Sequence, residues 1–120
     1  MTRNRTLAVA ALAMLALAVP AATGAAPAAP AASAATFAVQ ASDFRFKGIP
    51  RRTTRGTHLF RVRNTGRATH DLRIAGKRTR LLTSGQTQTL RVTLRKGRYP
   101  YICTVEGHAA LGMKGTLVVP

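Results

Sequence analysis

Apolar and polar residues alternate along much of the chain from residue 36 onward, with the period of two that is typical of β-strands. In the clearest segment, residues 86–94, Leu90, Val92 and Leu94 alternate with polar neighbours. Six or seven short strands with turns between them, and no amphipathic helix, predict an all-β domain, a Greek-key antiparallel β-sandwich. Besides 86–94, the expected strands cover residues 37–41, 44–46, 58–63, 70–74, 99–104 and 115–119, with a turn at 75–77.

The first 23 residues show the pattern of a secretory signal peptide. Arg3 and Arg5 precede an apolar run from Leu7 to Val19, which Pro20 ends. This run is too short to span a bilayer comfortably, and small residues that a signal peptidase accepts follow it. We therefore expect an exported protein, periplasmic or extracellular, with no stable membrane span after cleavage. An uncleaved signal would instead keep the protein associated with the membrane.

Residues 24–35 consist almost entirely of Ala and Pro. They lack side chains large enough for a core, so we interpret them as a linker or as the end of the signal. Residues 36–120 then form one folded domain. In a domain of this size burial alone gives marginal stability, to which a bound metal ion often adds.

The chain is strongly basic, with 19 Lys and Arg against 3 Asp and Glu and a formal net charge of +16. Three acidic residues are too few for a carboxylate-rich calcium or magnesium site, and they disfavour a paired-carboxylate hydrolase. Export and the low aromatic content of 5% disfavour nucleic acid as a partner. The basic residues fall on polar strand positions and in turns, which is consistent with a solvated face or with an acidic partner protein.

The single Cys excludes an intramolecular disulfide and a four-thiolate metal site. This residue, Cys103, ends a predicted strand, and His108 and Met113 follow it with four residues between each successive pair. Gly107 and Gly112 allow the intervening loop to curl. Taken singly, a Cys, a His or a Met is more often a core or surface residue than a ligand. Their arrangement in one loop indicates a shared site.

His70 follows a turn at residues 64–69, and at the same end of a sandwich it would reach this loop. A thiolate, two imidazoles and a thioether suit copper, as a trigonal plane of two His and one Cys with a distant axial Met. Catalytic zinc would need an open position for water and gains little from a thioether. A Cys–His hydrolase is the other alternative, but no oxyanion hole or orienting Asn is evident. We predict one copper ion bound by His70, Cys103, His108 and Met113.

With its Cys-x₄-His-x₄-Met spacing and the Gly-Thr-Leu-Val-Val strand after it, the segment 97–119 resembles the ligand loop of cupredoxins. These are the type 1 blue copper proteins of the plastocyanin, azurin and auracyanin kind. The resemblance extends over residues 36–120 through the first strand, the Asn-containing turn and His70. The spacing between Cys and His is longer than in plastocyanin and most similar to that in auracyanin. The resemblance implies a cupredoxin fold and the same four ligands.

In many cupredoxins an Asn follows the first His ligand and ties the two ligand loops together; here this position is Asp71. By analogy we expect Asp71 to accept a hydrogen bond from Thr104, next to Cys103. A carboxylate there would favour the oxidised metal. The remaining His, His58, shares the alternation of the apolar residues in its strand, and we expect it to be structural or at the surface rather than a ligand.

The function expected from these features is electron transfer by an exported, monomeric copper protein that is not an enzyme. A copper-binding or copper-delivery protein of the same fold is the alternative, and a small enzyme or redox-silent binding module is a third. Four-copper oxidase chemistry would need many more than the 3 His present. The loop 99–113 contains no basic residue. We therefore expect a redox partner, acidic in charge, to dock at an apolar patch around His108, steered by the Arg-rich flanks.

Overall fold

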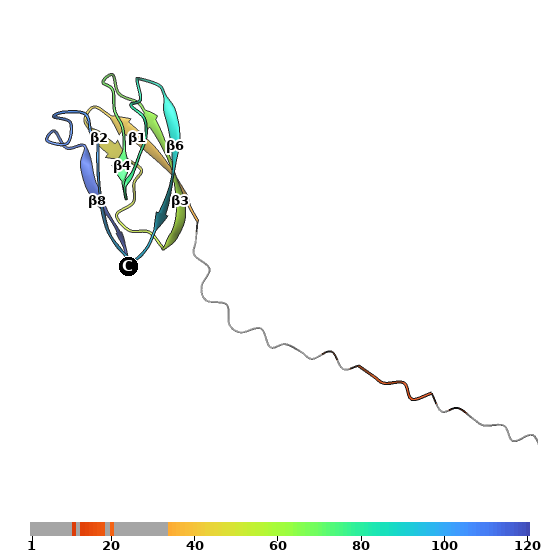
Figure 1. Cartoon of the computed structure of the whole chain (residues 1–120). Coiled ribbons are helices and arrows are strands. Elements are labelled where there is room, and N and C mark those ends of the chain that lie inside the picture. The colour runs from red at the N-terminus through yellow and green to blue at the C-terminus, as the bar shows by residue number, and fades with distance from the viewer. Residues whose placement is uncertain (1–10, 12, 19, 21–33) are drawn as a thin grey trace, which may run out of the picture.

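The computed structural model describes residues 11, 13–18, 20 and 34–120 (Figure 1). Most residues of the predicted signal peptide and linker lie outside the described part, so export stays a prediction. Within the part described, no helix is long and apolar enough to cross a membrane. The first strand begins at Thr36, where the alternating pattern starts.

The domain consists of two four-stranded sheets, which confirms the predicted all-β sandwich (Figure 1). The first sheet has the order β2-β1-β3-β6, and the second has the order β5-β4-β7-β8. The strands are β1 (Thr36–Ser42), β2 (Arg45–Lys47), β3 (Gly56–Asn64), β4 (Arg73–Ile74), β5 (Lys77–Arg78), β6 (Thr87–Leu94), β7 (Gly97–Ile102) and β8 (Lys114–Val119).

Alternation along each strand decides which side chains enter the space between the sheets. In β3, Phe60 and Val62 are buried, whereas Arg61 and Arg63 between and after them are exposed. Each fully buried aliphatic or Phe side chain contributes roughly 1.5–3 kcal/mol. The core contains Val39, Ala41, Phe60, Val62, Leu72, Ile74, Leu82, Leu90, Val92, Leu94, Cys103, Met113, Leu117 and Val119. Because Cys103 and Met113 belong to this core, the C-terminal loop is anchored in the packed interior.

One strand pairing differs from the antiparallel expectation. β1 and β3 pair in parallel, with Val39 opposite Val62. The short strand β2 and the segment 48–55 return the chain to the end at which β1 began, so β3 runs beside β1 in the same direction. Residue alternation does not report this, because the period of two is the same for either direction.

The expected strand at 70–74 is much shorter in the structure. His70 forms only an isolated bridge with Leu82, and β4 is limited to residues 73–74. The turn expected at 75–77 is narrower, because Lys77 already belongs to β5. Ala75 and Gly76, with φ of 50° and 74°, form the two-residue connection of a tight hairpin.

Candidate metal centre

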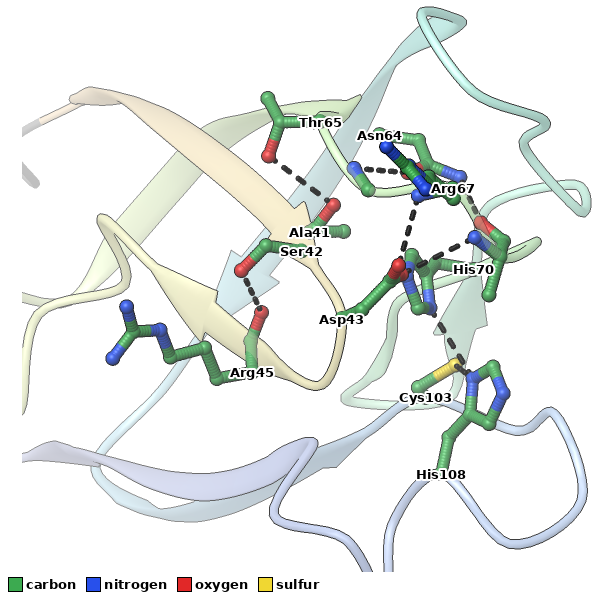
Figure 2. A network of polar contacts seen from close by, with 12 residues as sticks. Ala41, Ser42, Asp43, Arg45, Asn64, Thr65, Arg67, His70, Cys103 and His108 are labelled. Atoms are coloured by element: carbon green, nitrogen blue, oxygen red, sulfur yellow. Dashed lines mark hydrogen bonds and ion pairs between the residues drawn. The ribbon is translucent and has the colours of Figure 1, made fainter.

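Three of the four predicted ligand residues come together in the structure. The ligand-type atoms of His70, Cys103 and His108 all lie within 4.8 Å of one another. Nδ1 of His70 is 3.2 Å from Nδ1 of His108, and Sγ of Cys103 is 3.6 Å from that same His108 nitrogen (Figure 2). Among the described residues, no other group of His, Cys and acidic side chains has this spacing.

His70 is held by the chain between β3 and β4. Its N–H donates to the carbonyl of Leu82 at 3.0 Å, and its own carbonyl accepts from the Leu82 N–H at 2.7 Å. Asn64, at the end of β3, is fully buried and braces this loop from inside. Its Nδ2 donates to the carbonyls of Ala68 and Leu82, both at 2.7 Å, and its Oδ1 accepts from the Gly66 N–H at 2.9 Å. The sequence identified Asn64 only as part of a turn, because the hydrogen-bond partners of its side chain become neighbours only when the loop before His70 folds.

Cys103 comes directly after β7, and the chain then curls through residues 104–112 before β8. Gly107 and Gly112 have φ of 79° and 118°, where a side chain would strain the backbone. Within the curl the N–H of His108 donates to the carbonyl of Val105 at 3.1 Å. The predicted role of the two glycines is therefore confirmed. The curl returns the chain so that the imidazole of His108 faces Cys103 (Figure 2).

Met113, the fourth predicted ligand, is fully buried at the end of the curl. Its carbonyl accepts the N–H of Cys103 at 3.0 Å, and its own N–H donates to the carbonyl of His108 at 3.1 Å. Backbone hydrogen bonds thus tie Met113 to both neighbouring members of the cluster. A thioether at this place fits the soft donor set predicted from the sequence.

The thiol of Cys103 is 1% exposed. Burial raises the pKa of the Cys103 thiol, which favours the neutral thiol in the folded chain. A metal ion binds the thiolate, so loading the site must release this proton. The Cys103 sulfur is therefore shielded from solvent, and a metal ion can bind it by displacing the thiol proton.

The expected link between the two ligand loops is present. One carboxylate oxygen of Asp71 accepts the backbone N–H of Thr104 at 2.6 Å, and the other accepts the Thr104 hydroxyl. Asp71 is fully buried, and the guanidinium of Arg78 lies 3.9 Å from its Oδ2. Since Asp71 follows His70 and Thr104 follows Cys103, the pair holds the two loops at a constant separation.

Asp43, which the sequence analysis did not single out, contacts the cluster from the turn between β1 and β2. Its Oδ1 accepts the Nε2–H of His70 at 2.6 Å (Figure 2). The backbone N–H groups of Arg67 and Ala68 also donate to the carboxylate, at 2.9 and 3.2 Å. The hydrogen bond from Arg67, helped by His70, holds the pKa of Asp43 below its usual value. The only sequence signal for Asp43 was that acidic residues are scarce.

The ring of Phe44 packs against both imidazoles. Its centroid lies 4.9 Å from that of His108, at an interplanar angle of 65°. It lies 6.1 Å from the centroid of His70, at 85°. Phe44 begins the predicted strand at 44–46, and in the structure its partly buried ring restricts both imidazoles.

His58 is structural, and it lies outside the cluster. It is fully buried, and its Nδ1 accepts the backbone N–H of Ala35 at 3.0 Å. Nε2 therefore carries the proton and donates to the carbonyl of Thr54 at 2.7 Å. Its ring also packs on Phe37, with centroids 5.5 Å apart. The His58 side chain thus fastens the start of β1 and the loop before β3.

The comparisons with known proteins agree with this geometry. The family profile described as copper binding proteins of the plastocyanin/azurin family matches residues 52–120. No curated protein matches the chain significantly. The matched residues include all of the predicted ligands, whereas β1, β2 and Asp43 lie before them.

Solved structures share the fold. The dithionite-reduced auracyanin of Roseiflexus castenholzii has a TM-score of 0.60 at 20% identity, covering 74% of this chain and 98% of that one. Auracyanin A of Chloroflexus aurantiacus has a TM-score of 0.61 at 20% identity, with coverages of 73% and 100%. The blue copper oxidase of Nitrosomonas europaea has a TM-score of 0.61 at 17% identity, covering 72% of this chain but only 39% of the oxidase.

Proposed function

Because the chain belongs to the plastocyanin/azurin family of copper binding proteins, we propose that it is an exported electron carrier with a single type 1 copper site. The proposed ligands are His70, Cys103, His108 and Met113. The observation that carries this proposal is the convergence of two imidazole Nδ1 atoms and one buried thiol within 4.8 Å. A bound copper ion would supply the Cu(I)/Cu(II) couple.

The donors fit copper better than the other metals considered. Thiolate and thioether are soft ligands that stabilise Cu(I), and imidazole suits both oxidation states. A catalytic zinc site would gain little from the thioether of Met113, which is fully buried beside Cys103 in the core. The Cys–His hydrolase alternative has less support. Nε2–H of His70 bonds Asp43, so Nδ1, which faces the Cys103–His108 pair, has no proton to donate to an oxyanion, and Met113 would have no role.

The contacts around the cluster favour outer-sphere electron transfer. Asp71 and Thr104 fix the separation of the two loops, and Phe44 packs on both imidazoles. Ligands held in this way by the chain keep the same arrangement in either oxidation state, so that little reorganisation accompanies the electron. A copper-delivery protein would instead need ligands that release the copper ion readily, which ligands fixed by the chain do not favour.

His108 is the proposed exit for the electron. Its side chain is partly exposed, while His70 is fully buried. The same loop exposes Leu111, at 62% of its surface, next to the small residue Ala110. An apolar patch of this kind suits brief docking of a partner protein. The net charge of +16, from 19 Lys and Arg against 3 Asp and Glu, supports an acidic partner, and it stays strongly positive when cleavage removes Arg3 and Arg5.

The proposal is tested by the absorption spectrum of the exported form after addition of Cu(II). We expect one copper per chain and an intense thiolate-to-copper charge-transfer band that Cys103→Ser abolishes. A colourless adduct would overturn the type 1 assignment. Rapid electron exchange with retention of copper through repeated redox cycles is expected of a carrier. Loss of Cu(I) to a competing acceptor in each cycle would instead favour copper delivery.

A further inference from the structure

Asp43 lies behind the ring of His70, on the side away from the other members of the cluster. Its carboxylate receives three hydrogen bonds: the imidazole Nε2–H at 2.6 Å, and the backbone N–H groups of Arg67 and Ala68. Figure 2 shows Nε2 of His70 facing Asp43 while Nδ1 faces His108. Asp43 therefore contacts the opposite nitrogen of the ring from the one that belongs to the cluster.

This contact selects the tautomer of His70. An ionised carboxylate accepts hydrogen bonds and cannot donate them, so the nitrogen that faces Asp43 must carry the proton. In the neutral imidazole the lone pair then resides on Nδ1, which lies 3.2 Å from Nδ1 of His108. Without the carboxylate, either nitrogen could carry the proton, and the ring would lose the one hydrogen bond that it makes outside the cluster among the described residues.

The surrounding chain keeps the carboxylate in place. Gly66 lies so close to it that a Cβ at this position would collide with the carboxylate of Asp43. The backbone at Arg67 and Ala68 directs two N–H groups at the same carboxylate. Phe44, the next residue, packs its ring on both imidazoles. Asp43 thus lies at the surface of the domain, held against the loop that carries His70 by these contacts, with its side chain 28% exposed.

We propose that Asp43 is a positioning residue for the metal centre: it directs Nδ1 of His70 toward the metal and makes this imidazole a stronger donor. The inference rests on the proposed role of His70 as a copper ligand. Hydrogen bonding of a ligand imidazole to a carboxylate fixes the ring and raises its basicity, and loss of such a partner typically lowers metal affinity by roughly 10–100-fold. A more basic ligand with a negative charge behind it stabilises Cu(II) more than Cu(I).

The first test needs no copper. In the copper-free protein, long-range ¹H–¹⁵N correlations of the imidazole rings report which nitrogen carries the proton. We expect His70 to be wholly in the Nε2–H form in the wild-type chain and in Asp43→Asn, whose amide oxygen still accepts the bond. Asp43→Ala should bring in the Nδ1–H form. A His70 tautomer that is unchanged in Asp43→Ala would overturn the positioning role.

The second test measures copper. Asp43→Asn keeps the shape of the side chain and removes its charge, and Glu106→Gln is the matched control. Glu106 lies in the loop between Cys103 and His108, is exposed, and makes no side-chain hydrogen bond or ion pair among the described residues. We expect Asp43→Asn to lower Cu(II) affinity by about tenfold relative to Glu106→Gln, and Asp43→Ala by up to about 100-fold.

The reduction potential provides the third measurement. A tenfold loss of affinity confined to Cu(II) corresponds to a rise of about 59 mV for a one-electron couple. If Asp43→Asn and Glu106→Gln have the same Cu(II) affinity and potential, the proposal is wrong even where the blue site forms. If the chain binds no copper but Asp43→Ala alters the tautomer, the function proposed above fails while the positioning of the ring stands. If Asp43→Ala does not fold, the Cu(II) affinity and the reduction potential of Asp43→Asn still test the proposal.

Discussion

Replacement of Asp71 by Ala would remove the link between the two loops of the metal centre. The carboxylate is fully buried and accepts two hydrogen bonds from one residue, Thr104, through its backbone N–H and its hydroxyl. In Asp71→Ala the partly buried N–H of Thr104, in the loop after Cys103, loses its acceptor. Asp71→Asn keeps an acceptor for that N–H and removes only the charge, so the two variants separate the hydrogen bonds from the charge.

The structure sets the size of the effect. A hydrogen bond to a charged group contributes roughly 1.5–3 kcal/mol to the free energy of unfolding, so the two bonds together contribute about 3–6 kcal/mol. Part of this is recovered, because the variant no longer has to desolvate a carboxylate. The ion pair with Arg78 adds little, since that guanidinium is mostly exposed and 3.9 Å away. We expect Asp71→Ala to lower the free energy of unfolding by about 3 kcal/mol and Asp71→Asn by about 1 kcal/mol.

Urea unfolding of the copper-free protein under reducing conditions measures these differences, provided that the slope of free energy against urea stays the same. Arg78→Gln is the control, with an expected change within about 0.5 kcal/mol. A loss below about 1 kcal/mol in Asp71→Ala would refute the reasoning, because the buried hydrogen bonds would then contribute nothing. Equal losses in Asp71→Ala and Asp71→Asn would show that the charge, and not the hydrogen bonds, stabilises the fold.

The same Asp71→Asn variant should have a higher reduction potential than the wild-type chain, measured by voltammetry; an unchanged or lower potential would count against a charge effect on the metal. Burial raises the pKa of the Cys103 thiol above its usual value of 9.0, so copper binding near neutral pH releases a proton. Competition with a chelator should show copper affinity rising about tenfold per pH unit from neutral pH up to that pKa. A flat profile would mean that the thiol is already ionised. Stability changes with pH in the opposite direction. Below the pKa that the Cys103 thiol has in the unfolded chain, the copper-free fold has its full stability; urea unfolding should show this contribution lost as pH rises through the higher pKa of the folded chain. His58→Leu should destabilise the fold by about 1–3 kcal/mol in thermal unfolding, since it leaves a buried N–H and carbonyl unpaired, and should leave the charge-transfer band intact; loss of the band with the fold retained would make His58 part of the site. Association with the redox partner should slow as salt rises, as stopped-flow kinetics would show, and an independence of salt would exclude electrostatic steering.

Particular residues show which parts of the structure were predictable. The strand at 86–94 was readable because Leu90, Val92 and Leu94 repeat with the period of a strand, and they are indeed buried in β6. β4 and the hairpin connection after it fall within the predicted strand 70–74 and turn 75–77, but β5 was missed, since a strand of two residues is too short for periodicity. The Asp71–Thr104 contact was foreseen only through the family resemblance.

The fold class, the core positions of the alternating strands and the chemistry of the C-terminal loop followed from the sequence alone. Local rules suffice for these, because alternation sorts side chains between core and solvent, and because Cys103, His108 and Met113 are close along the chain. The proximity of His70 to this loop was inferred from its place after a turn, and in the structure its Nδ1 lies 3.2 Å from Nδ1 of His108.

The contacts of Asp43 and the direction in which β3 runs beside β1 became apparent only in the folded domain. Asp43 is 27 residues from His70 along the chain, and nothing local to either residue specifies the other. Their contact exists because the β1–β2 turn and the loop after β3 reach the same end of the sandwich. Such a meeting depends on how the strands are connected, which residue alternation does not encode.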